Sequence, residues 1–239
     1  MQIALIGYGK MGKAIEEIAL QRGHTIGLVV DMHNSIENNA VKLKNCDVAI
    51  EFSTPQSAVN NILNCINNGV PVVCGTTGWL KEKIAVEQYC IDKNGTFLYA
   101  SNFSIGVNIF FELNKKLAAL MARQSQYAIS VEEIHHTAKK DAPSGTAISL
   151  AEQIIDNVPG KTKWLNESST DPTVVPITSK RIDPAPGTHH VKYTSAIDDI
   201  EIIHTAHNRS GFALGAVLAA EFIYDKTGIF TMKDVLNIG

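Results

Sequence analysis

The chain has 239 residues, of which 21 are Lys or Arg and 24 are Asp or Glu, giving a formal charge of -3. This balance excludes a global positive field, so we expect neither nucleic acid nor a membrane surface as a partner. No apolar run approaches the roughly 20 residues of a membrane helix, and the N-terminus lacks the basic opening of a signal peptide. Four cysteines without a CxxC pair are typical of buried, reduced thiols, so we expect a cytoplasmic protein.

In the first half of the chain, short β-rich runs alternate with stretches of helical periodicity. The predicted strands are residues 2–6, 25–30, 47–52, 70–74 and 96–100, and the predicted helices are residues 11–22, 56–67 and 79–93. Such alternation is typical of a parallel sheet with helices on both faces. We therefore predict an α/β domain with a Rossmann-type, doubly wound parallel sheet.

The second half has a different rhythm and indicates a second domain that begins near residue 103. The predicted elements are helices at 105–122 and 146–156, a strand at 127–134, an antiparallel pair at 189–197 and 201–207, and a last helix at 211–225 that either domain could include. Residues 158–187 hold five of the eight prolines and are predicted to be loop and edge strand.

A glycine-rich turn joins the first predicted strand to the first predicted helix and fits the pattern G-x-G-x-x-G. In this pattern the first glycine permits the tight turn, the second lets a pyrophosphate approach the backbone, and the third lets helix and strand pack closely. The helix N-terminus then offers N–H groups to the pyrophosphate. We predict that the whole turn binds the cofactor: Gly7, Tyr8, Gly9, Lys10, Met11 and Gly12.

Asp31 follows the second predicted strand, nineteen residues after Gly12, about where a carboxylate binds the ribose hydroxyls of a dinucleotide. A carboxylate repels the 2′-phosphate of NADPH, and the next residues, Met32 and His33, bring no permanent cation. We predict NADH as the preferred cofactor. NADPH stays possible if a cation from elsewhere in the chain reaches the phosphate.

Two further polar turns follow predicted parallel strands, at the sheet edge where ligands of open α/β sheets bind. We predict that the first turn faces the nicotinamide ribose and carboxamide, although each turn alone is also explained by local side-chain caps. The turns are Gly75-Thr76-Thr77 and Ala100-Ser101-Asn102-Phe103.

A cluster of basic side chains stands in the middle of the chain, with two histidines and two lysines within six residues. These are His135, His136, Lys139 and Lys140. The following Ser144-Gly145-Thr146 offers hydroxyl and N–H groups at a predicted helix start, which suits a carboxylate. The segment predicts a receptor for a small anion with a proton donor beside it.

We predict no metal in this segment. Neighbouring residues on a strand point to opposite faces, so His135 and His136 do not share one ion, and the pair His189-His190 has the same geometry. No acidic third ligand stands at helical spacing from them. Taken singly, the lysines are also explained as solvated and the Pro-Ser-Gly-Thr run as a helix start, but their coincidence favours the anion site.

The run from His135 to Ala147, His-His-x-x-Lys-x-Asp-Ala-Pro-Ser-Gly-Thr-Ala, resembles the signature of the 4-hydroxy-tetrahydrodipicolinate reductase (dihydrodipicolinate reductase) family. Further similar segments occur in the family's order along nearly the whole chain, at residues 7–12, 75–78, 102–108 and 204–216, the last including Arg209. The departures lie mainly in residues 158–188.

The resemblance implies hydride transfer from NAD(P)H to a cyclic dicarboxylate imine, which yields tetrahydrodipicolinate in lysine and diaminopimelate biosynthesis. It implies a dinucleotide-binding domain of residues 1–103 and 208–239. Residues 104–207 would form an α+β domain whose open mixed sheet binds the small-molecule substrate and builds a homotetramer. The alternative is another two-domain NAD-dependent dehydrogenase that acts on an amino acid or sugar. A nicotinamide-sensing regulator is disfavoured, because the chain has no spare basic module for DNA.

By position in the signature, His135 and Lys139 correspond to the proton-donating pair, and His136 to a substrate contact. Gly145 and Thr146 correspond to the carboxylate-binding turn, and residues 75–77 and 100–103 to cofactor contacts. We favour Lys139 as the proton donor, while His135 orients the substrate or takes part in loss of water from the 4-hydroxy precursor.

Overall fold

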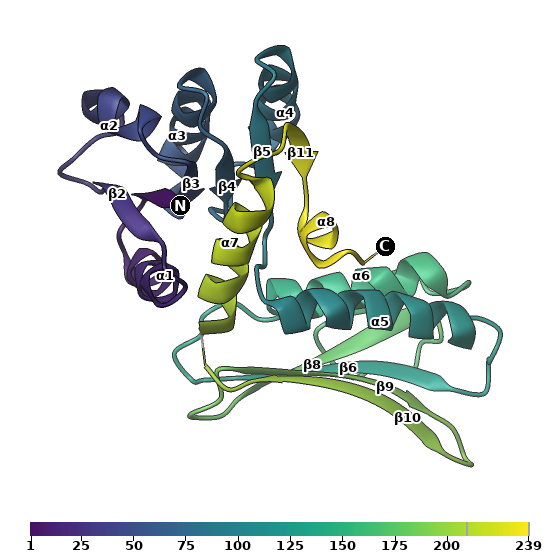
Figure 1. Cartoon of the computed structure of the whole chain (residues 1–239). Helices are drawn as coiled ribbons and strands as arrows, with labels where there is room; N and C mark the ends of the chain where they lie inside the picture. Colours follow the sequence, from purple (N-terminus) through teal and green to yellow (C-terminus); the bar gives the residue numbers. More distant parts are fainter. Residues whose placement is uncertain (209, 239) are drawn as a thin grey trace. The chain divides into compact units, whose positions relative to one another are not determined.

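The structure is a computed structural model that describes residues 1–208 and 210–238, and within them the chain divides into two compact units. The first unit contains residues 1–105 and the chain from Ser210 onward, and the second contains residues 106–208. Within the described residues, no helix combines the length and apolar character that a membrane crossing requires. Figure 1 traces both units along the chain.

Six parallel strands form the sheet of the first unit, in the spatial order β11-β5-β4-β3-β1-β2. Strand β1 pairs with β2 on one side and with β3 on the other, so the chain reverses its direction of travel across the sheet at β1. Ligands of open α/β sheets bind outside the carboxyl ends of the strands at such a point. The strands are β1 (Gln2–Ile6), β2 (Thr25–Val30), β3 (Val48–Glu51), β4 (Val72–Cys74), β5 (Thr96–Tyr99) and β11 (Gly228–Phe230).

Helices cover both faces of this sheet, which confirms the doubly wound prediction (Figure 1). One face packs against α1 (Lys10–Gln21), α7 (Ser210–Ile223) and α8 (Met232–Leu236). The other packs against α2 (Ala40–Lys44), α3 (Pro55–Asn67) and α4 (Lys83–Asp92), and 3-10 turns at Glu37–Asn39 and Leu80–Glu82 precede α2 and α4. The alanine-rich α7, left unassigned by its sequence, packs in this core beside β3, β4 and β5.

Five strands form the mixed sheet of the second unit, in the order β10-β9-β6-β8-β7. Strand β6 runs parallel to β8 and antiparallel to β9. Helices α5 (Ile105–Met121) and α6 (Gly145–Asn157) pack on one face through a shared apolar cluster. The strands are β6 (Ala128–His135), β7 (Lys163–Leu165), β8 (Val174–Arg181), β9 (Gly187–Thr194) and β10 (Asp199–Ala206).

The prediction of loop and edge strand for residues 158–187 is wrong for β8, which is an interior strand between β6 and β7. Of the five prolines in this stretch, only Pro176 lies inside β8, and the other four lie in connections. Val175 and Ile177 are fully buried in the cluster with α6. Their burial outweighs the cost of a proline in the strand, which removes one backbone donor.

Candidate active site

The glycine turn lies between the end of β1 and the start of α1, as predicted. Gly7 has a φ of +93°, and a Cβ there would overlap the carbonyl oxygen of Phe52. A Cβ at Gly12 would likewise overlap the carbonyl oxygen of Gly7, so both glycines are required by the fold itself. A Cβ at Gly9 would meet nothing within 4 Å. Gly9 therefore leaves open backbone where no neighbouring atom excludes a side chain, which fits the approach of a pyrophosphate.

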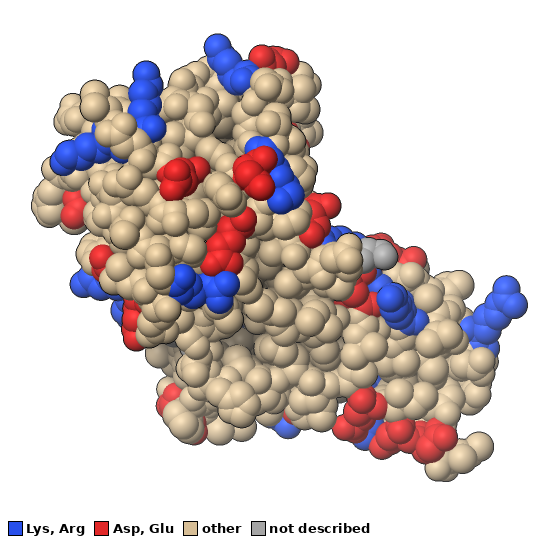
Figure 2. Space-filling model, viewed as in Figure 1, with Lys and Arg blue, Asp and Glu red and all other residues tan. Residues whose placement is uncertain are grey.

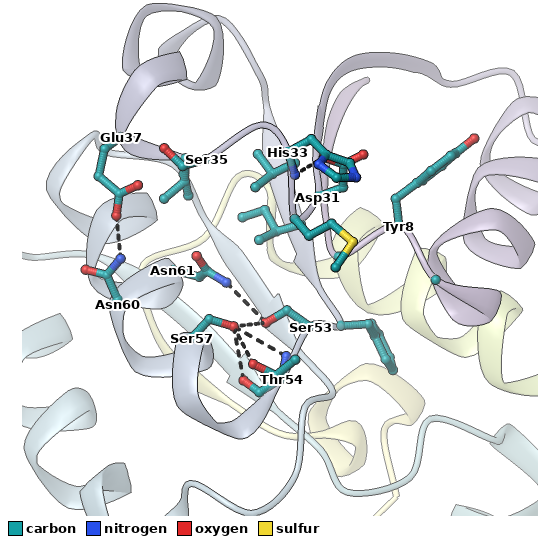
Figure 3. A pocket seen from close by; sticks show the side chains of 17 residues that line it. Tyr8, Asp31, His33, Ser35, Glu37, Ser53, Thr54, Ser57, Asn60 and Asn61 are labelled. Carbon is teal, nitrogen blue, oxygen red and sulfur yellow. Dashed lines mark hydrogen bonds between the residues drawn. The ribbon is translucent and has the colours of Figure 1, made fainter.

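A cavity of about 680 Å³ lies beside this turn (Figure 3). Its volume is in the range of small-molecule and cofactor sites. Asp31 stands at its edge directly after β2, and one of its carboxylate oxygens accepts the backbone N–H of His33 at 2.8 Å. The cavity is lined by residues 6–9, 30–33, 35–37 and 52–54 with Ser57, Asn60 and Asn61. These residues fit the adenosine and pyrophosphate portions of a dinucleotide.

Several polar residues of this cavity were missed by the sequence reasoning. Asn61 donates to the Ser53 hydroxyl at 3.1 Å, and Asn60 donates to the Glu37 carboxylate at 2.5 Å (Figure 3). The Asn60 hydrogen bond is the main cause that holds the pKa of Glu37 below its usual value. The signal that could have found them is the polar Ser53-Thr54 pair at the end of a predicted strand. Residues 75–77 were identified because they too are polar residues that follow a predicted strand.

A second cavity, of about 260 Å³, is lined by Met11, Phe52, Ser53, Pro55 and Gly75-Thr76-Thr77. The structure thus brings the predicted turn at residues 75–77 to a cavity beside Met11 of the glycine turn. Thr76 is buried, and its hydroxyl accepts the backbone N–H of Ser53 at 2.8 Å. A Cβ at Gly75 would overlap the Phe52 ring, so Gly75 makes room for a ring that lines both cavities.

The other predicted cofactor contacts have different positions. Tyr8 lines the larger cavity and donates its hydroxyl to Glu16, while Lys10 is exposed. Neither of the two cavities is lined by Ala100, Ser101, Asn102 or Phe103. Phe103 is instead buried with its ring centre 5.5 Å from that of Phe52. Cofactor contact by residues 100–103 therefore stays a prediction.

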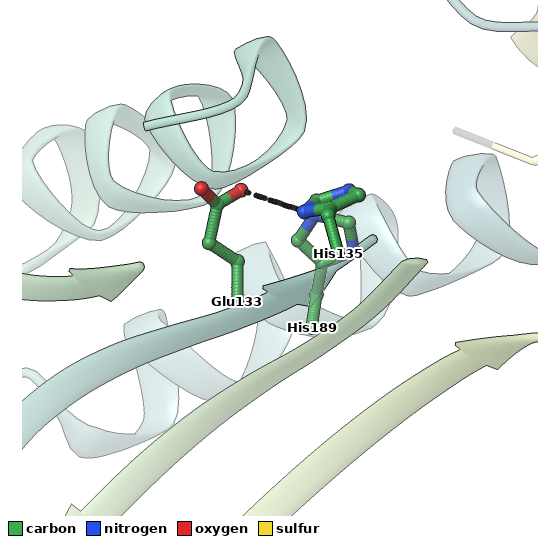
Figure 4. Close-up of side chains that lie close together, drawn as sticks. All are labelled: Glu133, His135 and His189. Atoms are coloured by element: carbon green, nitrogen blue, oxygen red, sulfur yellow. Dashed lines mark ion pairs between the residues drawn. The ribbon is translucent and has the colours of Figure 1, made fainter. Parts of the chain in front are cut away.

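In the second unit, a buried group of three side chains lies between β6 and β9 (Figure 4). Glu133 and His135 are two positions apart on β6, so they share its buried face. The antiparallel register places Glu133 opposite His189 on β9. The His135 Nδ1 atom lies 3.4 Å from a Glu133 oxygen, and the two imidazole centres are 5.1 Å apart. Strand pairing thus brings together one histidine from each His-His pair of the sequence, namely the buried His135 and His189.

Burial and hydrogen bonds together set the charge of this group. It lowers the pKa of His189 to about 3, and it lowers the pKa of His135 although the Glu133 charge acts in the opposite direction. Burial acts to raise the pKa of Glu133, but hydrogen bonds from Ser144 and Ser179 outweigh it and hold that pKa low. At neutral pH the group is therefore one carboxylate with two neutral imidazoles.

Glu133, His135 and His189 are residue types that bind divalent cations, and their ligand atoms lie within 4.8 Å of one another. Sequence reasoning missed Glu133, because it looked for a third ligand at helical spacing and not across strands. The Glu133 carboxylate is already bound by the Arg181 guanidinium at 3.3 Å and by the Ser144 N–H at 3.0 Å. Since Arg181 supplies the positive charge that a metal would bring, we assign no metal to this group.

Lys139 lies in the connection after β6, and its ammonium contacts both oxygens of Asp141, at 2.8 and 2.9 Å. Arg181 of β8 donates to the backbone carbonyl oxygen of Asp141 at 2.6 Å and to that of Lys139 at 3.4 Å. Arg181, absent from the predicted site, therefore holds the lysine segment in place. His136 is partly exposed, in contrast to the buried His135.

The N-terminus of α6 follows this segment, and Ser144 is its N-cap residue. Its hydroxyl accepts the N–H of Ala147 at 3.2 Å and lies 3.2 Å from Nε2 of His189, while its own N–H is bound by Glu133. Ser144 is buried and both groups already have partners within the protein, so it supports the turn from within, and its contact with a substrate stays a prediction. Gly145 and Thr146 carry first-turn N–H groups that no helical carbonyl can satisfy, and a Cβ at Gly145 would meet nothing within 4 Å.

The first unit has two cavities at a glycine turn on a doubly wound sheet, and the second unit carries histidine, lysine and a helix N-terminus. Together these features are typical of a two-domain oxidoreductase that uses a pyridine nucleotide. Residues 1–103 match the family model "Dihydrodipicolinate reductase, N-terminus", and residues 106–236 match "Dihydrodipicolinate reductase, C-terminus". The chain belongs to the dihydrodipicolinate reductase family. Arg209 of the family-like segment lies outside the described residues.

Relatives and a solved structure agree with this assignment. A 4-hydroxy-tetrahydrodipicolinate reductase of Christiangramia forsetii is 52% identical over 99% of this chain and 98% of its own length. One from Alkaliphilus oremlandii is 35% identical, covering 96% of this chain and 95% of that one. The fold is similar to that of a dipicolinate-bound dihydrodipicolinate reductase from Paenisporosarcina sp. TG-14, with a TM-score of 0.77, 22% identity and 98% coverage of both chains.

Proposed function

We propose that the protein reduces 4-hydroxy-tetrahydrodipicolinate, through the dihydrodipicolinate imine, to tetrahydrodipicolinate in lysine and diaminopimelate biosynthesis. The observation that carries the proposal is the ordered segment from His135 to Thr146, which places a lysine, two histidines and a helix N-terminus along one connection in a member of this family. Two carboxylates on the substrate account for the Lys139 ammonium together with the imidazole and backbone N–H donors of this segment. Another two-domain dehydrogenase activity would require the same segment to serve a different anion.

We propose the following division of roles, which the family membership and the residue types support. The bound pyridine nucleotide supplies the hydride, and residues 1–103 and 208–239 bind it. Within residues 104–207, Gly145 and Thr146 bind one substrate carboxylate through the N–H groups of α6, and His136 contacts the substrate. Lys139 donates the proton that neutralises the charge built up by hydride addition. His135, held neutral by burial, orients the substrate ring.

The cavity lining favours NADH over NADPH. Among its described lining residues are the carboxylates of Asp31 and Glu37 and no Lys or Arg. A 2′-phosphate near Asp31 would meet like charge without a compensating cation.

The test is a coupled assay in which the preceding synthase supplies the unstable substrate and loss of reduced cofactor is followed. We expect turnover only with that substrate, and a kcat/KM for NADH at least about tenfold above that for NADPH, which equals about 1.4 kcal/mol. Replacing Asp31 by Ser should narrow this ratio. No turnover with the pathway imine, but turnover with amino acids or sugars from a panel, would favour the other dehydrogenase class.

The open sheet of the second unit supports a homotetramer. Helices α5 and α6 pack on one face, and the opposite face carries exposed Ile203 of the edge strand β10. Edge strands and bare sheet faces of this kind are commonly covered by another chain. Light scattering should give about four times the 26.0 kDa of one chain, and Ile203→Lys should lower that mass. A monomer at micromolar concentration would contradict the proposal.

The four free, buried cysteines support a reducing, cytoplasmic location.

A further inference from the structure

The connections that carry the site in the second unit meet at one buried carboxylate. Glu133 has no exposed surface. Its oxygens accept the Ser144 N–H at 3.0 and 3.1 Å, at the start of α6. One oxygen accepts the Arg181 guanidinium at 3.3 Å, and the other lies 3.4 Å from the His135 ring. A carboxylate buried in this way is stable only with such partners, so its position and theirs are fixed together.

Each of these partners leads to a different part of the proposed substrate site. Ser144 directly precedes Gly145 and Thr146, the turn that would bind a carboxylate. Arg181 continues to the backbone carbonyl oxygens of Asp141 and Lys139, which fixes the lysine segment. His135 is the third, and its ring is confined on its other sides by the His189 ring and by Gly187, where a Cβ would come within 3.2 Å of its Nε2 atom.

We infer that Glu133 is a positioning residue of the reductase, which holds the α6 turn through the Ser144 N–H and the Lys139 segment through Arg181, and sets the charge environment of the His135 ring 3.4 Å away. This inference rests on the proposed function for the identity of the substrate. Glu133 touches neither substrate nor cofactor in this role. Its neighbour Glu132 points to the other face of β6, where it pairs with Lys180 at 2.6 Å, and has no part in the arrangement.

The negative charge of Glu133 also contributes to this role, in addition to its contacts. The groups that act on His135 are Glu133, Lys139, Arg181 and Asp141, with the neutral His189 ring in contact. Among them, the Glu133 carboxylate works against the lowering of the His135 pKa by burial. Replacing Glu133 by Gln keeps the size of the side chain but removes the charge, so the His135 pKa should fall further.

The experiment compares Glu133→Gln with Glu132→Gln, the matched change on the opposite face of the same strand. For Glu133→Gln we expect binding of dipicolinate, a stable dicarboxylate probe, and kcat/KM each to weaken about 10- to 100-fold, a loss of the size found for residues that orient the ligands of metal sites. NADH affinity should be unchanged. The titration of His135 followed by NMR should move to lower pH. Glu132→Gln should match the wild type in all four measurements.

The inference is overturned if Glu133→Gln binds dipicolinate, turns over and titrates at His135 like the wild type, or if a loss of dipicolinate binding comes without a shift of the His135 titration. If Glu133→Gln does not fold, Arg181→Lys provides the second test, because it weakens the hydrogen bonds to the Lys139 and Asp141 carbonyl oxygens. Arg181→Lys should lower the affinity for dipicolinate and leave the affinity for NADH unchanged. An unchanged dipicolinate affinity in this variant would overturn the inference. A wild-type protein that binds dipicolinate but does not reduce the imine would contradict the proposed function and leave the positioning test valid.

Discussion

Replacing Lys139 by Met is expected to lower kcat by about 100- to 10,000-fold, the usual contribution of a positioned proton donor. The change removes the ammonium but keeps most of the length of the side chain. The affinity for NADH should stay within about twofold, less than 0.5 kcal/mol, because the glycine turn and its cavities belong to the other compact unit. Steady-state kinetics with the pathway imine and a fluorescence titration with NADH measure the two quantities separately.

Lys140→Met is the control for this prediction, since Lys140 is adjacent and exposed but has no assigned role. It should leave kcat near the wild-type value. A Lys139→Met variant with unchanged kcat and a large loss of NADH affinity would reverse the assignment and place this lysine with the cofactor. If His135→Gln abolishes turnover and Lys139→Met does not, the proton donor is His135 or a water molecule bound by it.

The first unit was predictable from local sequence signals because each element there is a contiguous run with its own period. The predicted strands at residues 2–6 and 25–30 coincide with β1 and β2. The missed pieces are the three-residue β11 and the five-residue α2 and α8, which are too short to show a period. Strand β8 of the second unit was missed for another reason: Pro176 and the charged end Lys180-Arg181 are typical of a loop, whereas burial under α6 and pairing with β6 and β7 favour a strand.

In the second unit, the candidate site was predictable only as far as it is continuous in sequence. His135, Lys139 and the α6 turn belong to one connection, and their residue types alone indicate an anion site. Glu133, Arg181 and His189 complete it from three strands, and their meeting depends on the register of β6 with β8 and β9. Register is set by turns and by the burial of one whole face of a strand, so no local sequence motif predicts it. The alternation of Glu133 and His135 on one strand was the available hint.

The glycine turn permits a test in which neighbouring glycines respond in opposite ways. Gly7→Ala should destabilise the protein by about 3 kcal/mol or more, because the new Cβ would overlap the Phe52 carbonyl oxygen at a backbone φ that alanine rarely adopts. For a chain of this size that corresponds to a fall in Tm of about 6 to 12 °C. Thermal unfolding followed by circular dichroism measures it.

Gly9→Ala should leave Tm within about 3 °C, since its Cβ meets nothing within 4 Å and the backbone there has an ordinary φ of -80°. The same Cβ would stand against a pyrophosphate, so the Kd for NADH should rise about tenfold or more, a loss of about 1.4 kcal/mol or more. If Gly9→Ala binds NADH like the wild type, the pyrophosphate does not lie on this turn, and the cavity beside it serves another purpose. Because neither a steric contact nor a positive φ requires glycine at this position, this variant separates the demands of the ligand from those of the fold.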